Sequence, residues 1–121
     1  MIFNGPVTLR HVGPVVECGL GWRGIVSHFM REMDSIHPLH GAVTFRNSAI
    51  TGHIDITVHG DIPYDERTIA DIIILLDQAE KLSQRFCESC GTTEDVSTVQ
   101  QPHALRMITR CPGCLQREHP R

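Results

Sequence analysis

Cys87-Glu-Ser-Cys90 and, after twenty intervening residues, Cys111-Pro-Gly-Cys114 are the most informative segments of this 121-residue chain. Two Cys-x-x-Cys pairs at such a separation are typical of a tetrahedral zinc site built from four thiolates. Two residues between the cysteines let the backbone form a tight knuckle whose N–H groups point at the sulfurs. Gly91, directly after the first pair, suits such a turn. The expected ligands of one Zn²⁺ per chain are Cys87, Cys90, Cys111 and Cys114.

The residues between the two pairs have the pattern of a hairpin. Residues 96–100 and 105–110 are expected to form two short strands, joined across residues 101–104. Knuckle, hairpin and knuckle together make a zinc ribbon, and a helix over residues 115–119 would make the module treble-clef-like. Without a metal, a tail of this length has too few apolar residues to hold itself together.

The expected zinc has a structural role. Four thiolates close its coordination shell, whereas a catalytic zinc normally keeps one position for water or substrate. The chain has five cysteines in total, and an odd number without a secretion signal favours metal ligation over a disulfide framework. The fifth, Cys18, has no base near it in the sequence and is expected to be a buried, inert thiol.

Upstream of the cysteine pairs the apolar pattern predicts a mixed domain. Apolar residues recur at helical spacing over residues 22–36, which predicts an amphipathic helix. Residues 42–46 and 53–59 alternate with period two around turn residues, which predicts an antiparallel hairpin. Short extended pieces are expected at residues 6–12 and 15–18, which are bounded by Gly5-Pro6, Gly13-Pro14 and Gly19.

A second, longer helix is expected to begin at the N-cap Asp65 and to run to the first metal ligand. The predicted fold is α+β: two helices packed on a small antiparallel sheet, with a C-terminal zinc ribbon or treble-clef-like module. Residues 1–86 would form the core and residues 87–121 the ribbon, structurally continuous with each other. The side chains expected in the core are Trp22, Phe29, Met33, Ile54, Ile56, Ile69, Ile73 and Leu76.

The charge pattern bears on the partner. The net charge is −3, and residues 1–80 carry a balance of −5 while residues 81–121 carry +2. Four thiolates around one Zn²⁺ add a charge of −2, which brings the C-terminal part to neutrality. A nucleic-acid contact stays open as the alternative, although only Phe86 offers a ring for stacking near the ribbon. Its candidate residues are Arg85, Arg106, Arg110 and Arg117.

Neither an enzyme nor a membrane protein is indicated. The chain has no phosphate-binding glycine loop, nucleophile elbow or H-E-x-x-H motif. His103 between the cysteine pairs raises the question of an HNH-type nuclease, but the accompanying Asp-His pair and later Asn are missing. The longest apolar run, residues 72–76, is far shorter than the ~18 residues of a membrane span. We expect a cytoplasmic, non-enzymatic protein with no small-molecule substrate.

The order of the motifs resembles a family of small bacterial and phage-associated proteins of unknown function. The matching parts are Cys18-Gly-Leu-Gly-Trp22 at the start of a helix, a strand hairpin, and the run from Gln78 through Cys87-Glu-Ser-Cys90-Gly91. The resemblance covers residues 17–116. It implies no reaction, but its association with mobile elements implies a protein that binds and modulates host machinery.

Two functions are therefore expected, in this order. The first is a protein–protein interaction module or inhibitor, such as an anti-defence protein of a phage or other mobile element. The alternative is a small nucleic-acid-binding regulator of the transcription type. Surface charge separates the two, because a basic ribbon face favours nucleic acid whereas an acidic core favours a basic protein partner.

Overall fold

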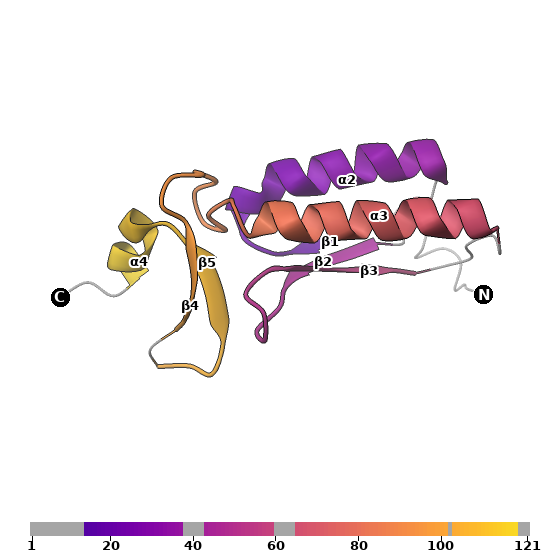
Figure 1. The fold of residues 1–121 in the computed structure, drawn as a ribbon. Helices are drawn as coiled ribbons and strands as arrows, with labels where there is room; N and C mark the ends of the chain where they lie inside the picture. The colour runs from indigo at the N-terminus through magenta and orange to yellow at the C-terminus, as the bar shows by residue number, and fades with distance from the viewer. Residues whose placement is uncertain (1–13, 38–42, 60–64, 102, 119–121) are drawn as a thin grey trace, which may run out of the picture.

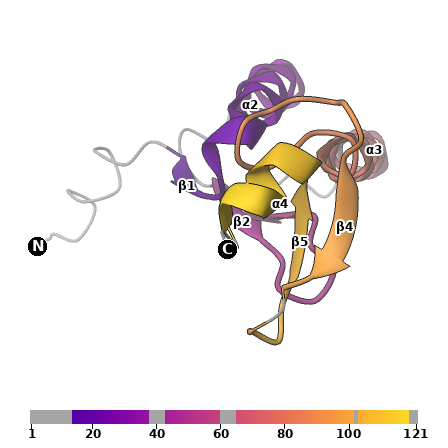
Figure 2. The ribbon, with the colours of Figure 1, turned by 90° about the vertical axis from the view of Figure 1, so that its left-hand side faces the viewer.

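A computed structural model of the chain, which describes residues 14–37, 43–59, 65–101 and 103–118, has the predicted α+β fold. Two helices, α2 and α3, lie side by side over one face of a three-stranded sheet (Figure 1). A two-stranded hairpin and a short helix, α4, lie beyond the end of this layer (Figures 1 and 2). Of the helices in the described ranges, none is both long and apolar enough to cross a membrane.

The first helix confirms the amphipathic helix that the spacing of apolar residues predicts. A single 3₁₀ turn, η1 (Leu20–Trp22), leads into α2 (Arg23–Ile36). The predicted apolar stripe faces the sheet, and Trp22, at the junction of the two elements, is completely buried. Phe29 packs edge-on against Phe45 of the sheet, with 5.6 Å between ring centroids. The helix is therefore held by its apolar face rather than by end caps, since no side chain caps its N-terminus.

The sheet contains the predicted hairpin and one parallel strand. Strands β2 (Val43–Asn47) and β3 (Ile54–Val58) pair antiparallel, with Phe45 opposite Ile56. Strand β1 (Val15–Glu17) pairs with β2 in parallel, so the sheet is mixed rather than purely antiparallel. Helix α2 provides the crossover that a parallel pair requires. The extended piece expected at residues 6–12 lies outside the described residues.

The second helix, α3 (Glu66–Ser83), begins as predicted but buries a different face. The Asp65 carboxylate caps it by accepting hydrogen bonds from the hydroxyl and backbone N–H of Thr68, which hold the pKa of this carboxyl below its usual value. The prediction that Ile69 and Ile73 lie in the core is wrong. They are 37% and 58% exposed, because the buried stripe is centred on Ile72, Leu75 and Ala79.

The C-terminal module has the predicted knuckle, hairpin and knuckle. Strands β4 (Ser97–Gln100) and β5 (Met107–Arg110) pair antiparallel and lie across the end of the core (Figures 1 and 2). Helix α4 (Pro112–Glu118) begins three residues earlier than expected, so the last cysteine lies within it. A hairpin followed by a helix that starts at the second knuckle is the treble-clef-like arrangement.

Candidate metal centre

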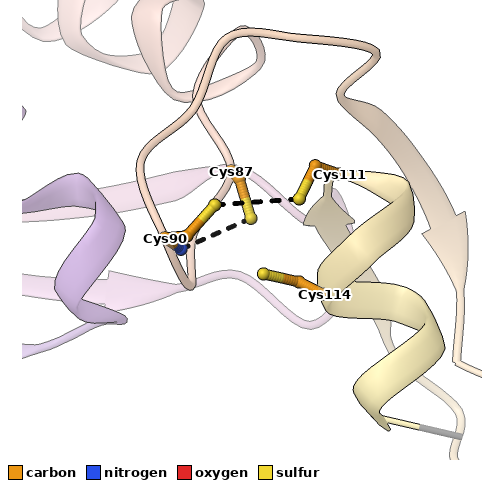
Figure 3. A group of neighbouring side chains, drawn as sticks. All are labelled: Cys87, Cys90, Cys111 and Cys114. Carbon is orange, nitrogen blue, oxygen red and sulfur yellow. Dashed lines mark hydrogen bonds between the residues drawn. The ribbon is translucent and has the colours of Figure 1, made fainter.

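Two segments that are far apart in the sequence bring the four cysteine sulfurs together. The first pair follows α3, and the second pair stands at the start of α4 (Figure 3). The four Sγ atoms all lie within 4.8 Å of one another. Cys87, Cys111 and Cys114 are buried while Cys90 is exposed. The arrangement forms a group of thiols that could hold one metal ion.

The first knuckle directs backbone N–H groups at a sulfur. The Cys90 N–H donates to Cys87 Sγ at 3.5 Å, and the Gly91 N–H closes the turn on the Cys87 carbonyl oxygen at 2.9 Å. Gly91 has a φ of +85°, a conformation that favours glycine. Burial raises the pKa of the Cys87 thiol, but hydrogen bonds from the backbone of Cys90, Cys111 and Ser89 outweigh burial and lower this pKa to about 6.

The second half of the cluster disfavours a free thiolate. Burial raises the pKa of Cys114 to about 11, and the neighbouring thiols of Cys111, Cys87 and Cys90 reinforce the shift, although the Arg117 guanidinium opposes it from 2.9 Å. Four thiolates confined to this volume would repel one another strongly. A metal ion would remove this repulsion, because deprotonated sulfurs would ligate it and it would compensate their charge.

The N-terminal segment holds the first knuckle from the other side. The Gly21 N–H donates to the Glu88 carbonyl oxygen at 2.8 Å, and the indole Nε1–H of Trp22 donates to the Phe86 carbonyl oxygen at 2.8 Å. A Cβ atom at Gly21 would overlap the Cys87 carbonyl oxygen and lie 2.6 Å from the Gly91 nitrogen. The Trp22–Phe86 hydrogen bond joins residues that are 64 positions apart. The Gly-Trp motif and the Cys-Glu-Ser-Cys-Gly motif therefore pack against each other in one contact.

Glu88, a residue that the sequence analysis did not single out, connects the core to the ribbon. Its side chain is 5% exposed. It accepts hydrogen bonds from Asn47 Nδ2 at 2.7 Å and from the Thr109 N–H at 3.0 Å, and it faces the Arg110 guanidinium at 3.7 Å. The carboxylate thus joins the end of β2 to β5 from inside the knuckle, so it positions the ribbon without being a metal ligand.

The turn between β2 and β3 makes a second junction with the ribbon. The Thr109 hydroxyl donates to the Gly52 carbonyl oxygen at 2.6 Å, and the Met107 N–H donates to the Ala49 carbonyl oxygen at 2.8 Å. His53 Nε2 lies 3.4 Å from the Thr98 hydroxyl. These hydrogen bonds cross the predicted boundary between residues 86 and 87. The division into a core of residues 1–86 and a ribbon of residues 87–121 stays a prediction.

The four candidate arginines differ in their surroundings. Arg85 is exposed at the end of α3, and Arg106 is half-buried just before β5. The Arg110 side chain is 14% exposed and faces Glu88. The exposed Arg117 donates to Cys114 Sγ. Two of the four are therefore engaged with the knuckles, and a contact of any of them with nucleic acid stays a prediction.

Cys18 stands apart from the cluster. It is half-buried and packs against the core of the α2–α3 layer. Burial raises the pKa of its thiol, which keeps the sulfur protonated and unreactive near neutral pH. Its surroundings fit the expected inert thiol.

The comparisons with known proteins yield no relative. No family model matches the chain, and neither the curated proteins nor the solved structures include a significant match. The function must therefore be argued from the site itself.

Replacing Glu88 tests its connecting role. Glu88→Gln would set an amide against the Asn47 amide donor and remove the charge that faces Arg110. We expect a loss of about 1–3 kcal/mol in the free energy of unfolding, the usual cost of an unsatisfied buried polar group. The matched control Glu94→Gln makes the same charge change at an exposed ribbon residue and should stay within about 0.5 kcal/mol. Urea denaturation measures both free energies of unfolding. If Glu88→Gln proved as stable as Glu94→Gln, Glu88 would not connect the core to the ribbon.

Proposed function

We propose that the four cysteines bind one Zn²⁺ per chain. A tetrahedral zinc with Zn–S bonds of about 2.3 Å separates its sulfurs by about 3.8 Å, and the Cys90 and Cys111 sulfurs lie 3.7 Å apart. Thiolates are soft ligands, and tetrahedral four-sulfur sites hold zinc or iron. Zinc is the better match to a ribbon whose cysteines alternate with short turns and strands. The visible absorption spectrum of the purified protein distinguishes zinc from iron, since only an iron site would be coloured.

The proposed role of the zinc is structural. Four protein ligands leave no position for a water or a substrate, and hydrogen bonds from the backbone and from Arg117 surround the sulfurs. The proposal is therefore of a non-enzymatic protein without a small-molecule substrate. A reducing compartment such as the cytoplasm suits a chain whose cysteines are all free thiols.

The zinc ribbon is proposed to present a protein-binding surface. The observation that carries this is the placement of Arg110, whose charge faces the buried carboxylate of Glu88 instead of projecting from the ribbon. Together with the balance of −5 over residues 1–80, this favours a protein partner over a polyanion. The resemblance to phage-associated proteins adds the proposal that the partner is a host protein and that binding inhibits it.

The alternative is a nucleic-acid-binding regulator. The exposed Arg85 favours it, because its guanidinium has no hydrogen bond or ion pair in the part of the chain that the structure describes. A regulator that neutralises several phosphates would bind with a steep salt dependence, with a slope near −0.9 per phosphate on duplex DNA.

Affinity capture with the tagged, zinc-loaded full chain tests the proposal. We expect a protein from the native host that is retained after nuclease treatment and forms a complex of fixed stoichiometry when both components are purified. Duplex DNA at ~150 mM salt should bind no tighter than the non-specific range, roughly 10⁻⁴–10⁻⁶ M. Loss of the partner on nuclease treatment, or sub-micromolar binding of a defined DNA or RNA, would instead favour the regulator.

A further inference from the structure

A cavity of 400 Å³ opens where the start of α2, the end of α3 and the first knuckle meet. Figure 1 shows these three segments converging at the ribbon end of the helical layer. The volume lies within the range of sites that bind small ligands or single large side chains. Its lining combines the apolar side chains of Ile25, Leu82 and Phe86 with the imidazole of His28 on α2 and three glycines around them, Gly21, Gly24 and Gly91.

The cavity continues onto a basic surface of α3. A neighbouring depression of 320 Å³ shares Leu82 with it and is also lined by Lys81 and Arg85. Lys81 pairs with Asp77 at 2.9 Å, so the unpartnered charge here belongs to Arg85. The first turn of α2 adds backbone N–H groups with neither a side-chain cap nor an acidic residue, and this end of a helix favours anions. An apolar floor therefore lies beside a locally cationic rim.

Gly24 is not explained by the packing of the chain on itself. A Cβ atom at Gly24 would meet nothing within 4 Å, whereas a Cβ at Gly21 would collide with the knuckle. Gly24 lies in the first turn of α2, and no contact among the described residues requires the absence of a side chain there. A bare backbone on the wall of a groove lets another chain approach closely.

We infer that this groove binds an acidic segment of a partner protein that carries one or two large apolar side chains. The apolar side chains cover Leu82 and Phe86, the backbone of the segment passes Gly24, and carboxylates face Arg85. The inference rests on the proposed protein-binding function and assigns it a site and a partner chemistry. The balance of −5 over residues 1–80 disfavours a long polyanion, so the segment carries only a few carboxylates near Arg85 and binds chiefly through its apolar side chains.

A peptide occupant fits the groove better than nucleic acid does. Bases bind by stacking on exposed rings along a positively charged track, and here Phe86 is a half-buried part of the floor. Arg85 supplies a single unpartnered charge, which suits one carboxylate rather than a run of phosphates.

Titration of the zinc-loaded full chain followed by NMR tests the inference. The first probe is a synthetic peptide with a central Leu-Phe pair flanked by glutamates; the second has Gly-Ser in place of Leu-Phe, and the third has lysines in place of the glutamates. The fourth probe is a dodecamer of deoxythymidine. We expect saturable shifts of the Gly24 amide and the Leu82 methyl groups with the first probe, and binding at least about tenfold weaker with the other three.

Three variants locate the contact. Arg85→Glu reverses the rim charge and Gly24→Leu fills the groove, and each should weaken binding of the first peptide at least about tenfold without lowering the melting temperature. Arg67→Glu makes the same charge reversal at the opposite, exposed end of α3 and should change nothing. Equal binding of all four probes, tighter binding of the oligonucleotide, or shifts confined to another surface would overturn the inference.

The same variants separate this inference from the proposed function. A captured protein partner that binds Arg85→Glu and Gly24→Leu as well as the parent would overturn the groove while the protein-binding function stands. If the groove binds the acidic peptide but the specific partner of the chain proves to be nucleic acid, the proposed protein-binding function is overturned and the groove stands.

Discussion

Removing the proposed zinc should unfold the ribbon while the two-helix layer keeps its structure. Apparent zinc-binding free energies of roughly 10–16 kcal/mol in zinc-finger peptides are also folding free energies, and the ribbon's own buried cluster consists of Cys87, Cys111 and Cys114 with Val96 packed against it. In hydrogen-exchange mass spectrometry, a strong chelator should abolish the protection of residues 97–110. Helices α2 and α3 should stay protected, because they share a separate apolar core.

A matched pair of serine variants checks that the effect comes from the cluster. Cys87→Ser removes a buried ligand and should lose the metal and the protection of the ribbon together. Cys18→Ser removes the cysteine outside the cluster and should keep the full metal content. A ribbon that stays protected in the metal-free chain would contradict the structural role of the zinc.

Truncation of the single tryptophan should give the largest loss of stability among the core substitutions. Trp22 is 0% exposed, and replacing a buried aromatic side chain with alanine costs about 3–5 kcal/mol. Trp22→Ala also leaves the Phe86 carbonyl oxygen without its donor. In a chain of this size the melting temperature should fall by more than about 10 °C, as measured by circular dichroism.

Two further variants separate the packing of Trp22 from its hydrogen bond. Trp22→Phe keeps an aromatic ring but no indole N–H, so it should cost about 1–3 kcal/mol for the orphaned carbonyl. Leu20→Ala, two residues earlier and 73% exposed, should stay within about 0.5 kcal/mol of the parent. A melting temperature of Trp22→Ala within two degrees of the parent would mean that the residue is not a core anchor.

Periodicity and cysteine spacing predicted most of the fold because both reflect constraints within a short segment of the chain. Alternation in residues 54–58 requires one buried and one exposed face, and the structure has both. The spacing of the cysteine pairs predicted both knuckles and the hairpin between them. The parallel pairing of β1 could not be predicted, because a strand of three residues between Gly13-Pro14 and Gly19 carries no information about its partner strand.

The errors on α3 and the omission of Glu88 have physical causes. Residues 72–76 are five apolar residues in a row, and such a run is compatible with several helix faces, so only packing against α2 and β3 selected Ile72 and Leu75 over Ile73. Glu88 lies between two cysteines, where a charged residue looks like an exposed turn. Its burial depends on Asn47, Thr109 and Arg110, which are 41, 21 and 22 positions away.

X-ray absorption at the zinc edge of the purified full chain tests the central claim most directly. The position of the edge identifies the metal, and the fine structure counts its ligands by element and distance. The account predicts four sulfur ligands at about 2.3 Å and no nitrogen or oxygen ligand. A shell of three sulfurs with one oxygen would contradict it, because a zinc with a bound water has the open position of a catalytic site.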